Sequence, residues 1–226
     1  MESTGIVKVG GVSAVLVGVS LVAMRVTGSF GIESFATTGQ SLLYIADHLP
    51  VYLTQQSLFM LTFLLTIPAA LGFYTALRPA GSVAVLATAA VIAGALIGVD
   101  HTLRVMRTWE SLAPAYAEAD AATRLSLEVM YRTATGGASH QLEWALVSGI
   151  GVGLFSVAIL RTALLPKWIA WLGLFAALAG WLHLLTIVWD VWLLHEIKFD
   201  SFNFWILVTG VALLRLRGSV SPTREE

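Results

Sequence analysis

Cysteine is absent from this 226-residue chain, and charged side chains are scarce. Without a thiol the chain forms no disulfide, thiolate metal site or iron–sulfur cluster, so any bound metal would depend on His, Asp and Glu side chains. Only 12% of the residues are charged, and the formal net charge is −1. This near-neutral balance, with no basic and aromatic surface, argues against nucleic acid as a partner.

The motifs of several enzyme classes are missing as well. The sequence contains no His-Glu-x-x-His, no Gly-x-Ser-x-Gly and no Walker-type or dinucleotide-binding loop. It therefore gives no support to a zinc protease, a serine hydrolase or a nucleotide-binding protein, and whether the chain is an enzyme stays open. Its lysines, Lys8, Lys167 and Lys198, all stand at the ends of apolar segments. We therefore expect no buried lysine and no retinal Schiff base.

Apolar residues dominate what is present. They make up 57% of the chain, and the mean hydropathy is +0.81, far above the range of a soluble domain. The predicted fold is an all-α, polytopic membrane protein that forms one domain over residues 1–226 and resides in a lipid bilayer. Six transmembrane helices are predicted, over residues 6–27, 57–77, 82–103, 137–159, 168–194 and 199–216.

Two connecting segments carry much of the polar character. Residues 29–56 are mixed in composition and end in an Asp-His-Leu-Pro turn, so we expect them at one membrane face. Residues 107–137 are rich in charge and place Leu125, Met130 and Tyr131 at helical spacing. This pattern predicts an amphipathic surface helix between the third and fourth spans.

The fifth predicted span, 168–194, contains two ionisable residues, His183 and Asp190. They are seven residues apart and therefore share one helical face, which continues backwards through Gly180, Ala176 and Gly173. In lipid, small residues permit close helix packing, and ionisable ones turn toward protein or trapped water. We expect this face to point into the bundle.

Six crossings would place both termini on one side of the membrane. That side carries seven Lys and Arg residues and the other carries six, so the positive-inside rule favours cytoplasmic termini. The alternating crossings would also gather many polar residues near the opposite face. These are His48, Asp100, His101, His140, Glu143, Asp190, His195 and Glu196, with His183 deeper in the layer.

The first functional hypothesis is a metal or haem site among the third, fourth and fifth spans. His101, His140 and His183 are the candidate cofactor ligands, and Glu143 and Asp190 are further candidate metal ligands or hydrogen-bond acceptors. The spacing itself specifies no metal. Most polar residues at helix ends need only water, whereas an ionisable group inside the apolar layer costs about 2.5–3.5 kcal/mol and suggests a function.

Two other hypotheses stay open. A small proton-coupled transporter would use Glu143, His183 and Asp190 as titrating groups, although the two halves of the chain show no internal repeat. An accessory or assembly subunit would instead use the Ala- and Gly-rich faces and the predicted surface helix as contacts with a membrane-protein partner or a second copy.

The last part of the chain also carries a family pattern. Leu165-Pro166-Lys167-Trp168 is followed by Trp171-Leu172-Gly173, and the final run contains Phe204-Trp205, Thr209-Gly210 and Leu214-Arg215. This pattern resembles a family of small six-helix bacterial membrane proteins described only as a domain of unknown function, with Pro-Lys/Arg-Trp-x-x-Trp-Leu-Gly at the start of the fifth helix. The resemblance covers about the last quarter of the chain. It implies a bacterial plasma-membrane protein and supplies no functional residues.

Overall fold

The computed structural model describes residues 3–29, 37–135, 139–182, 184–185 and 192–216, and this part of the chain is helical apart from short turns. Its elements are α1 (Ser3–Ser29), α2 (Thr38–Asp47), α3 (Leu49–Leu77), η1 (Arg78–Ala80), α4 (Ser82–Glu118), α5 (Ala121–Thr135), α6 (Ser139–Trp144), η2 (Ala145–Val152), α7 (Gly153–Thr162), α8 (Lys167–Leu182) and α9 (Trp192–Arg215).

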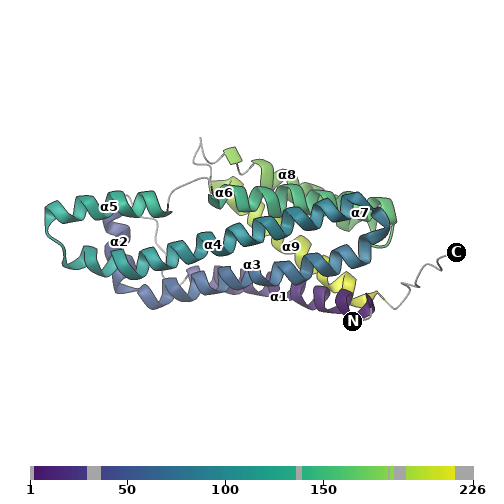
Figure 1. Ribbon diagram of the computed structural model, residues 1–226, viewed down its shortest axis with the longest axis horizontal. Coiled ribbons are helices and arrows are strands. Elements are labelled where there is room, and N and C mark those ends of the chain that lie inside the picture. The colour runs from purple at the N-terminus through teal and green to yellow at the C-terminus, as the bar shows by residue number, and fades with distance from the viewer. Residues whose placement is uncertain (1–2, 30–36, 136–138, 183, 186–191, 217–226) are drawn as a thin grey trace.

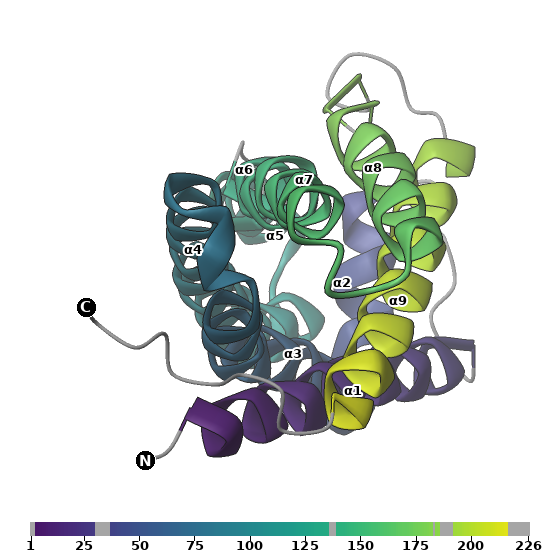
Figure 2. The same cartoon turned by 90° about the vertical axis from the view of Figure 1, so that its right-hand side faces the viewer.

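The long helices form a ring. Its order is α1, α3, α4, the continuous α6–η2–α7 segment, α8 and α9, and contacts between α9 and α1 close it (Figure 2). Successive members run in opposite directions, so the start of α1 and the end of α9 lie at the same end of the bundle (Figure 1). Side chains with polar or ionisable groups that face the ring interior are therefore enclosed by protein.

Five helical segments are long and apolar enough to cross a membrane: Thr4–Val26, Leu49–Ala80, Ser82–Glu118, Gln141–Thr162 and Glu196–Arg215. The chain is thus a multi-pass membrane protein by the length and composition of its helices. α8 has 16 residues, which corresponds to about 24 Å at 1.5 Å per residue, less than the ~30 Å hydrocarbon layer. The predicted number of six spans is therefore not confirmed by the described residues.

Several predicted boundaries differ from the observed ones. The predicted fifth span ran from 168 to 194, but residues 192–194 belong to α9, which begins before the predicted start at 199. α3 begins at Leu49, ahead of the predicted 57, because Pro50 in its first turn is well suited to a helix start. The expected turn before it is present at His48.

The predicted surface helix over 107–137 is wrong as a single element. α4 continues to Glu118, and after a break α5 runs back antiparallel to it (Figure 1). Asp120 accepts a hydrogen bond of 2.8 Å from the Thr123 N–H and so caps the start of α5. The charged segment forms a helical hairpin that extends the bundle, because part of its apolar face packs on neighbouring helices.

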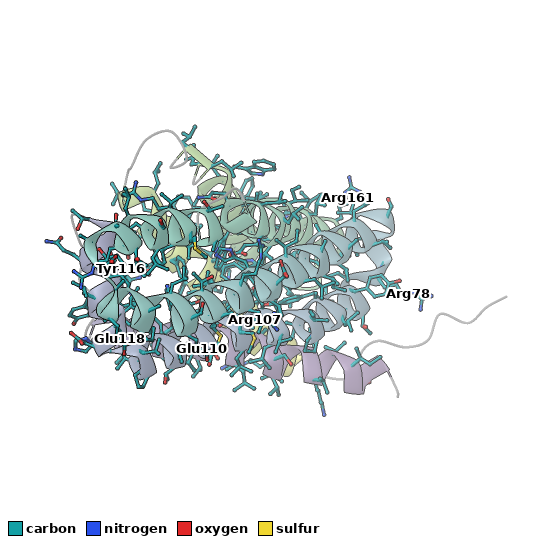
Figure 3. All side chains as sticks on the ribbon, turned by 60° about the vertical axis from the view of Figure 1, so that its left-hand side comes forward. Arg78, Arg107, Glu110, Tyr116, Glu118 and Arg161 are labelled. Atoms are coloured by element: carbon teal, nitrogen blue, oxygen red, sulfur yellow. The ribbon has the colours of Figure 1, made fainter. Side chains whose placement is uncertain are left out.

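This extension has its own small core. The Tyr116 hydroxyl donates a 2.7 Å hydrogen bond to Glu128 of α5, and the Arg124 guanidinium lies 5.3 Å from the centre of the Tyr116 ring. Figure 3 shows Tyr116 and Glu118 at one end of the molecule and Arg78 and Arg161 at the other. The buried residues of this second core are Leu42, Ile45, Tyr52, Val105, Trp109, Ala113 and Tyr116.

Glycines allow the closest helix crossings in the ring. A Cβ added to Gly72 of α3 would lie 2.5 Å from the Gly10 Cα of α1, and one added to Gly98 of α4 would lie 2.5 Å from the Phe63 ring. On α8, Gly173, Ala176 and Gly180 are all buried. The expectation that the small-residue face of this helix points into the bundle is confirmed.

Candidate functional site

A buried lysine is the most unusual feature of the bundle interior. Lys198 lies in the second turn of α9 and is 0% exposed. Four and seven residues further along the same face lie Phe202 and Trp205, both buried, so the helical period places Lys198 on the inward side of α9. The expectation that no lysine is buried is therefore wrong, although Lys198 does lie at a span end.

Aromatic rings surround the Lys198 ammonium. Its Nζ lies 4.6 Å from the centre of the Trp144 ring and 4.8 Å from that of Phe199, and it has no hydrogen-bond partner among the described residues. Trp144 itself is buried and packs on Phe202, with ring centres 5.4 Å apart, and on Phe63, at 5.9 Å. We call Trp144, Phe199, Phe202 and Phe63 the aromatic wall.

Glu143 lies beside this wall on α6, immediately before Trp144, and is also 0% exposed. Its carboxyl group interacts electrostatically with His101, Lys198 and Arg104, in decreasing order of strength. A Cβ on Gly94 of α4 would lie 2.8 Å from the Glu143 carbonyl oxygen, so α4 and α6 are in close contact at this level. The half-buried His101 lies two turns further along α4. Thus α4, α6 and α9 together place one acidic and two basic groups in what we call the Glu143–Lys198 site.

The energetics show why these groups belong together. An ionised lysine or carboxylate in a membrane helix costs about 2.5–3.5 kcal/mol. A desolvated cation–π contact returns roughly 2 kcal/mol, so the two rings near Lys198 offset its burial in part or in full. Lys198 and His101 are basic groups that interact electrostatically with the Glu143 carboxyl. The charge of each group depends on the others.

A π-helical segment, η2, follows the site directly, from Ala145 to Val152. The Ser148 hydroxyl in this segment donates a 3.1 Å hydrogen bond to the Ala176 carbonyl of α8. A Cβ on Gly180 would lie 2.9 Å from the Ser148 Oγ, so α8 packs tightly against the widened turn. π-helical turns inside α-helices are frequent at functional sites, and this one connects the Glu143–Lys198 site to α8.

The structure places the sequence-predicted ligands only in part. It brings His101 and Glu143 into one electrostatic neighbourhood. His140 belongs to α6, one turn before Glu143, but its side chain lies outside the described residues, as do His183 and Asp190 altogether. Within the described residues there is no group of three or more His, Asp or Glu side chains that could hold a metal ion. The five-residue ligand set stays a prediction.

Other polar residues at the same end have local partners. Asp100 pairs with Arg104 one turn on, at 2.9 Å, as their spacing predicts. His48 stacks on Tyr44 with ring centres 4.1 Å apart, and its Nδ1 lies 3.0 Å from the Tyr44 carbonyl oxygen. These contacts account for three polar residues without a ligand.

Arg25, near the end of α1, forms ion pairs with Glu196 and Asp200 of α9. These ion pairs could not be predicted from the sequence alone, because the paired residues are more than 170 positions apart. Glu196 also interacts electrostatically with Lys198. The ion pairs therefore connect the end of α1 to the first turns of α9, near Lys198.

Comparison with known proteins identifies a family and no activity. A family model described as "Domain of unknown function (DUF4386)" matches residues 16–216. No curated protein and no solved structure matches the chain. Because the family model covers most of the sequence, the chain belongs to this family of domains of unknown function, DUF4386.

Proposed function

We propose that this multi-pass membrane protein is a small proton-coupled carrier, in which Glu143 binds the proton and Lys198 is its counter-charge. The observation that supports the proposal is the complete burial of both side chains in one site of the bundle. Ionisable groups inside the membrane layer are costly and mark ion pathways and proton relays in membrane proteins. A purely structural position would be served better by an apolar side chain of similar size.

Two protonation states of the site explain how it would work. With the proton on Lys198, the carboxylate and the ammonium form an ion pair beside the aromatic wall. Uptake of one further proton by the Glu143 carboxylate gives a neutral acid beside the Lys198 ammonium, which the aromatic rings still hold, and release of that proton restores the ion pair. His101 is half-buried on α4 and interacts with Glu143, so it is the group that would exchange the proton with one aqueous face.

Proton flux into vesicles tests this function. The purified protein is incorporated into liposomes that contain a trapped pH-sensitive dye, and a potassium diffusion potential, negative inside, drives protons inward. We expect acidification faster than in empty liposomes, and a loss of the difference in Glu143→Gln and Lys198→Met. Glu110→Gln, on the exposed part of α4 outside the site, is the matched control and should keep the flux.

Equal rates for the protein, empty liposomes and Glu143→Gln would show that the site moves no proton in the absence of a substrate, and the proposal would then depend on whether the site binds a proton. Infrared difference spectroscopy between acidic and alkaline pH gives a second readout that does not depend on flux. A protonated carboxyl band that disappears in Glu143→Gln and shifts in Lys198→Met would assign the proton to this site. A spectrum unchanged by both substitutions would count against it, provided that circular dichroism shows both variants folded.

A second candidate function is binding of a metal ion or haem by His101, His140, His183, Glu143 and Asp190. It is favoured by one observation: Glu143 is buried and interacts with His101. Elemental analysis and the visible absorption spectrum of the purified protein test it. Stoichiometric metal or a haem band that is lost in His101→Ala and His183→Ala supports this function, and a colourless, metal-free, folded protein rejects it.

Two further predictions belong with these proposals and await their own measurements. Residence in a bacterial plasma membrane with cytoplasmic termini is testable by accessibility labelling of each terminus. A role as an accessory or assembly subunit predicts a stable membrane-protein partner or homo-oligomer on purification in mild detergent.

A further inference from the structure

A surface groove of about 440 Å³ lies between α8 and α9. The turn before α8 and the first turn of that helix form one wall, with Pro166 and Trp168, and the last turns of α9 form the other, with Val208, Val211 and Ala212. Its volume lies in the range of small-ligand pockets, ~300–1,000 Å³. All of its lining residues are apolar except Arg215.

Local structure explains why a hollow forms here. Ala163, at the end of α7, has a positive φ of 50° and so turns the chain sharply before α8 begins at Lys167. The groove lies where this turn and the start of α8 face the last turns of α9, and the small Ala212 side chain is part of its lining. Arg215 lines the groove at the end of α9.

Among the described residues, all charged side chains at the end of the bundle where α8 begins and α9 ends are positive. The acidic residues of α3 to α9 that the structure describes lie toward the opposite end or in the helical extension. Arg78 and Arg161 are visible at the groove end in Figure 3. The described basic residues at this end are Lys8, Arg78, Arg161, Lys167 and Arg215.

We propose that the groove binds an anionic phospholipid, with one acyl chain between α8 and α9 and the phosphate on Arg215. The apolar lining matches a hydrocarbon chain, and the exposed Trp168 ring lies where an indole commonly meets the headgroup region. A guanidinium binds phosphate through two parallel hydrogen bonds, whereas a zwitterionic headgroup also brings a positive charge toward this basic face. The site therefore selects an anionic headgroup.

Quenching of Trp168 by brominated lipid tests the proposal. The full-length protein is placed in phosphatidylcholine vesicles that contain a small mole fraction of either phosphatidylglycerol or phosphatidylcholine with brominated acyl chains. The chain has eight tryptophans, so the fluorescence of Trp168 is obtained as the difference between the emission of the protein and that of Trp168→Phe. We expect brominated phosphatidylglycerol to quench this difference at mole fractions where brominated phosphatidylcholine does not.

Two variants separate the headgroup from the chain. Arg215→Gln should weaken the preference for phosphatidylglycerol about fivefold, the effect of one basic residue near an anionic membrane surface. Ala212→Phe, which fills the groove and keeps Arg215, should abolish the selective quenching, and the smaller change Ala212→Leu should reduce it. Arg78→Gln is the matched control, since Arg78 is basic and at the same end but does not line the groove.

Each alternative has a distinct result. Equal quenching by the two brominated lipids, or equal loss in Arg215→Gln and Arg78→Gln, would show only the general charge of this face and overturn the proposal. Displacement by soluble glycerol phosphate at the concentration of the lipid would mean that the site binds phosphate without a chain, which also overturns it. A change of oligomeric state in Ala212→Leu with unchanged quenching would assign the groove to a second copy of the chain instead.

Discussion

Substitution of Lys198 by methionine gives the sharpest test of the Glu143–Lys198 site. Methionine keeps most of the length of lysine and stays compatible with the aromatic wall, but it removes the positive charge. The Nζ contacts with the Trp144 and Phe199 rings, at 4.6 and 4.8 Å, are then lost. Glu143 keeps its interactions with His101 and Arg104.

The expected magnitude follows from these contacts. Removing one member of a buried charge pair destabilises a protein by about 3–5 kcal/mol, because the other charge is left uncompensated. Lys198→Met should show a loss of this order, and Glu143→Gln a smaller one, because the Trp144 and Phe199 rings still compensate the Lys198 ammonium. The double variant removes both charges and should be close to the original stability, since a neutral pair carries no charge-burial cost. The interaction energy between the two substitutions should therefore be at least about 3 kcal/mol, the loss expected for Lys198→Met alone.

Unfolding in mixed micelles measures these free energies. The protein is titrated with sodium dodecyl sulfate and its helical content is followed by circular dichroism for the original chain, the two single variants and the double variant. An interaction energy below about 0.5 kcal/mol, the usual error of additivity, would refute the reasoning. It would mean that the two groups do not depend on each other for their charge.

An exposed ion pair within α4 provides the control. Asp100 and Arg104 are 2.9 Å apart, but their side chains are 69% and 51% exposed. Solvent screens such a pair, and its interaction energy should be only about 0.3–0.5 kcal/mol. The same cycle with Asp100→Asn and Arg104→Gln should therefore give a much smaller value than the buried site, and similar values in both cycles would show that the assay does not separate burial from charge.

Two further predictions concern the scaffold. Gly72→Leu should destabilise the fold by roughly 1–3 kcal/mol, because its Cβ alone would lie 2.5 Å from the Gly10 Cα. Gly5→Leu is the control, because nothing lies within 4 Å of the Cβ added there. This variant should unfold like the original chain in the same micelle titration. The hydrogen bond from the Thr123 N–H lowers the pKa of Asp120 below its ordinary value, so its contribution to α5 is complete above about pH 4 and is lost as the pH falls through the lowered pKa. The protection of the α5 amides, measured relative to their intrinsic exchange rate at each pH, should thus fall on acidification, and Asp120→Asn should show no such step.

The fold class and the membrane residence follow from the sequence because they depend on local properties. A run of about 20 apolar residues must form a helix in lipid, where no water is present to bond its backbone groups. The inward face of α8 and the Asp100–Arg104 pair were also predictable, since helical spacing alone brings the residues of each onto one face. The lengths of α3 and α4 were underestimated because hydropathy marks where a chain is apolar and not where a helix ends.

The candidate site was predictable in Glu143 and His101 but not in Lys198. Glu143 stands inside an apolar run, which is itself a signal of function. Lys198 stands at the edge of such a run, where lysines commonly extend to water. Lys198 lies on the same helical face as Phe202 and Trp205, and this spacing would have indicated that Lys198 is buried. It would not have indicated which residues surround it.

By itself, then, the sequence determined that this chain is a bundle of apolar helices with small residues at their contacts and a carboxyl group within the membrane layer, because each of these properties is encoded within a few turns of one helix. Only the tertiary structure decided that Lys198 is enclosed. Its surroundings come from Phe63 on α3 and Trp144 on α6 as well as from α9 itself, and the interior of the ring exists only where these helices meet.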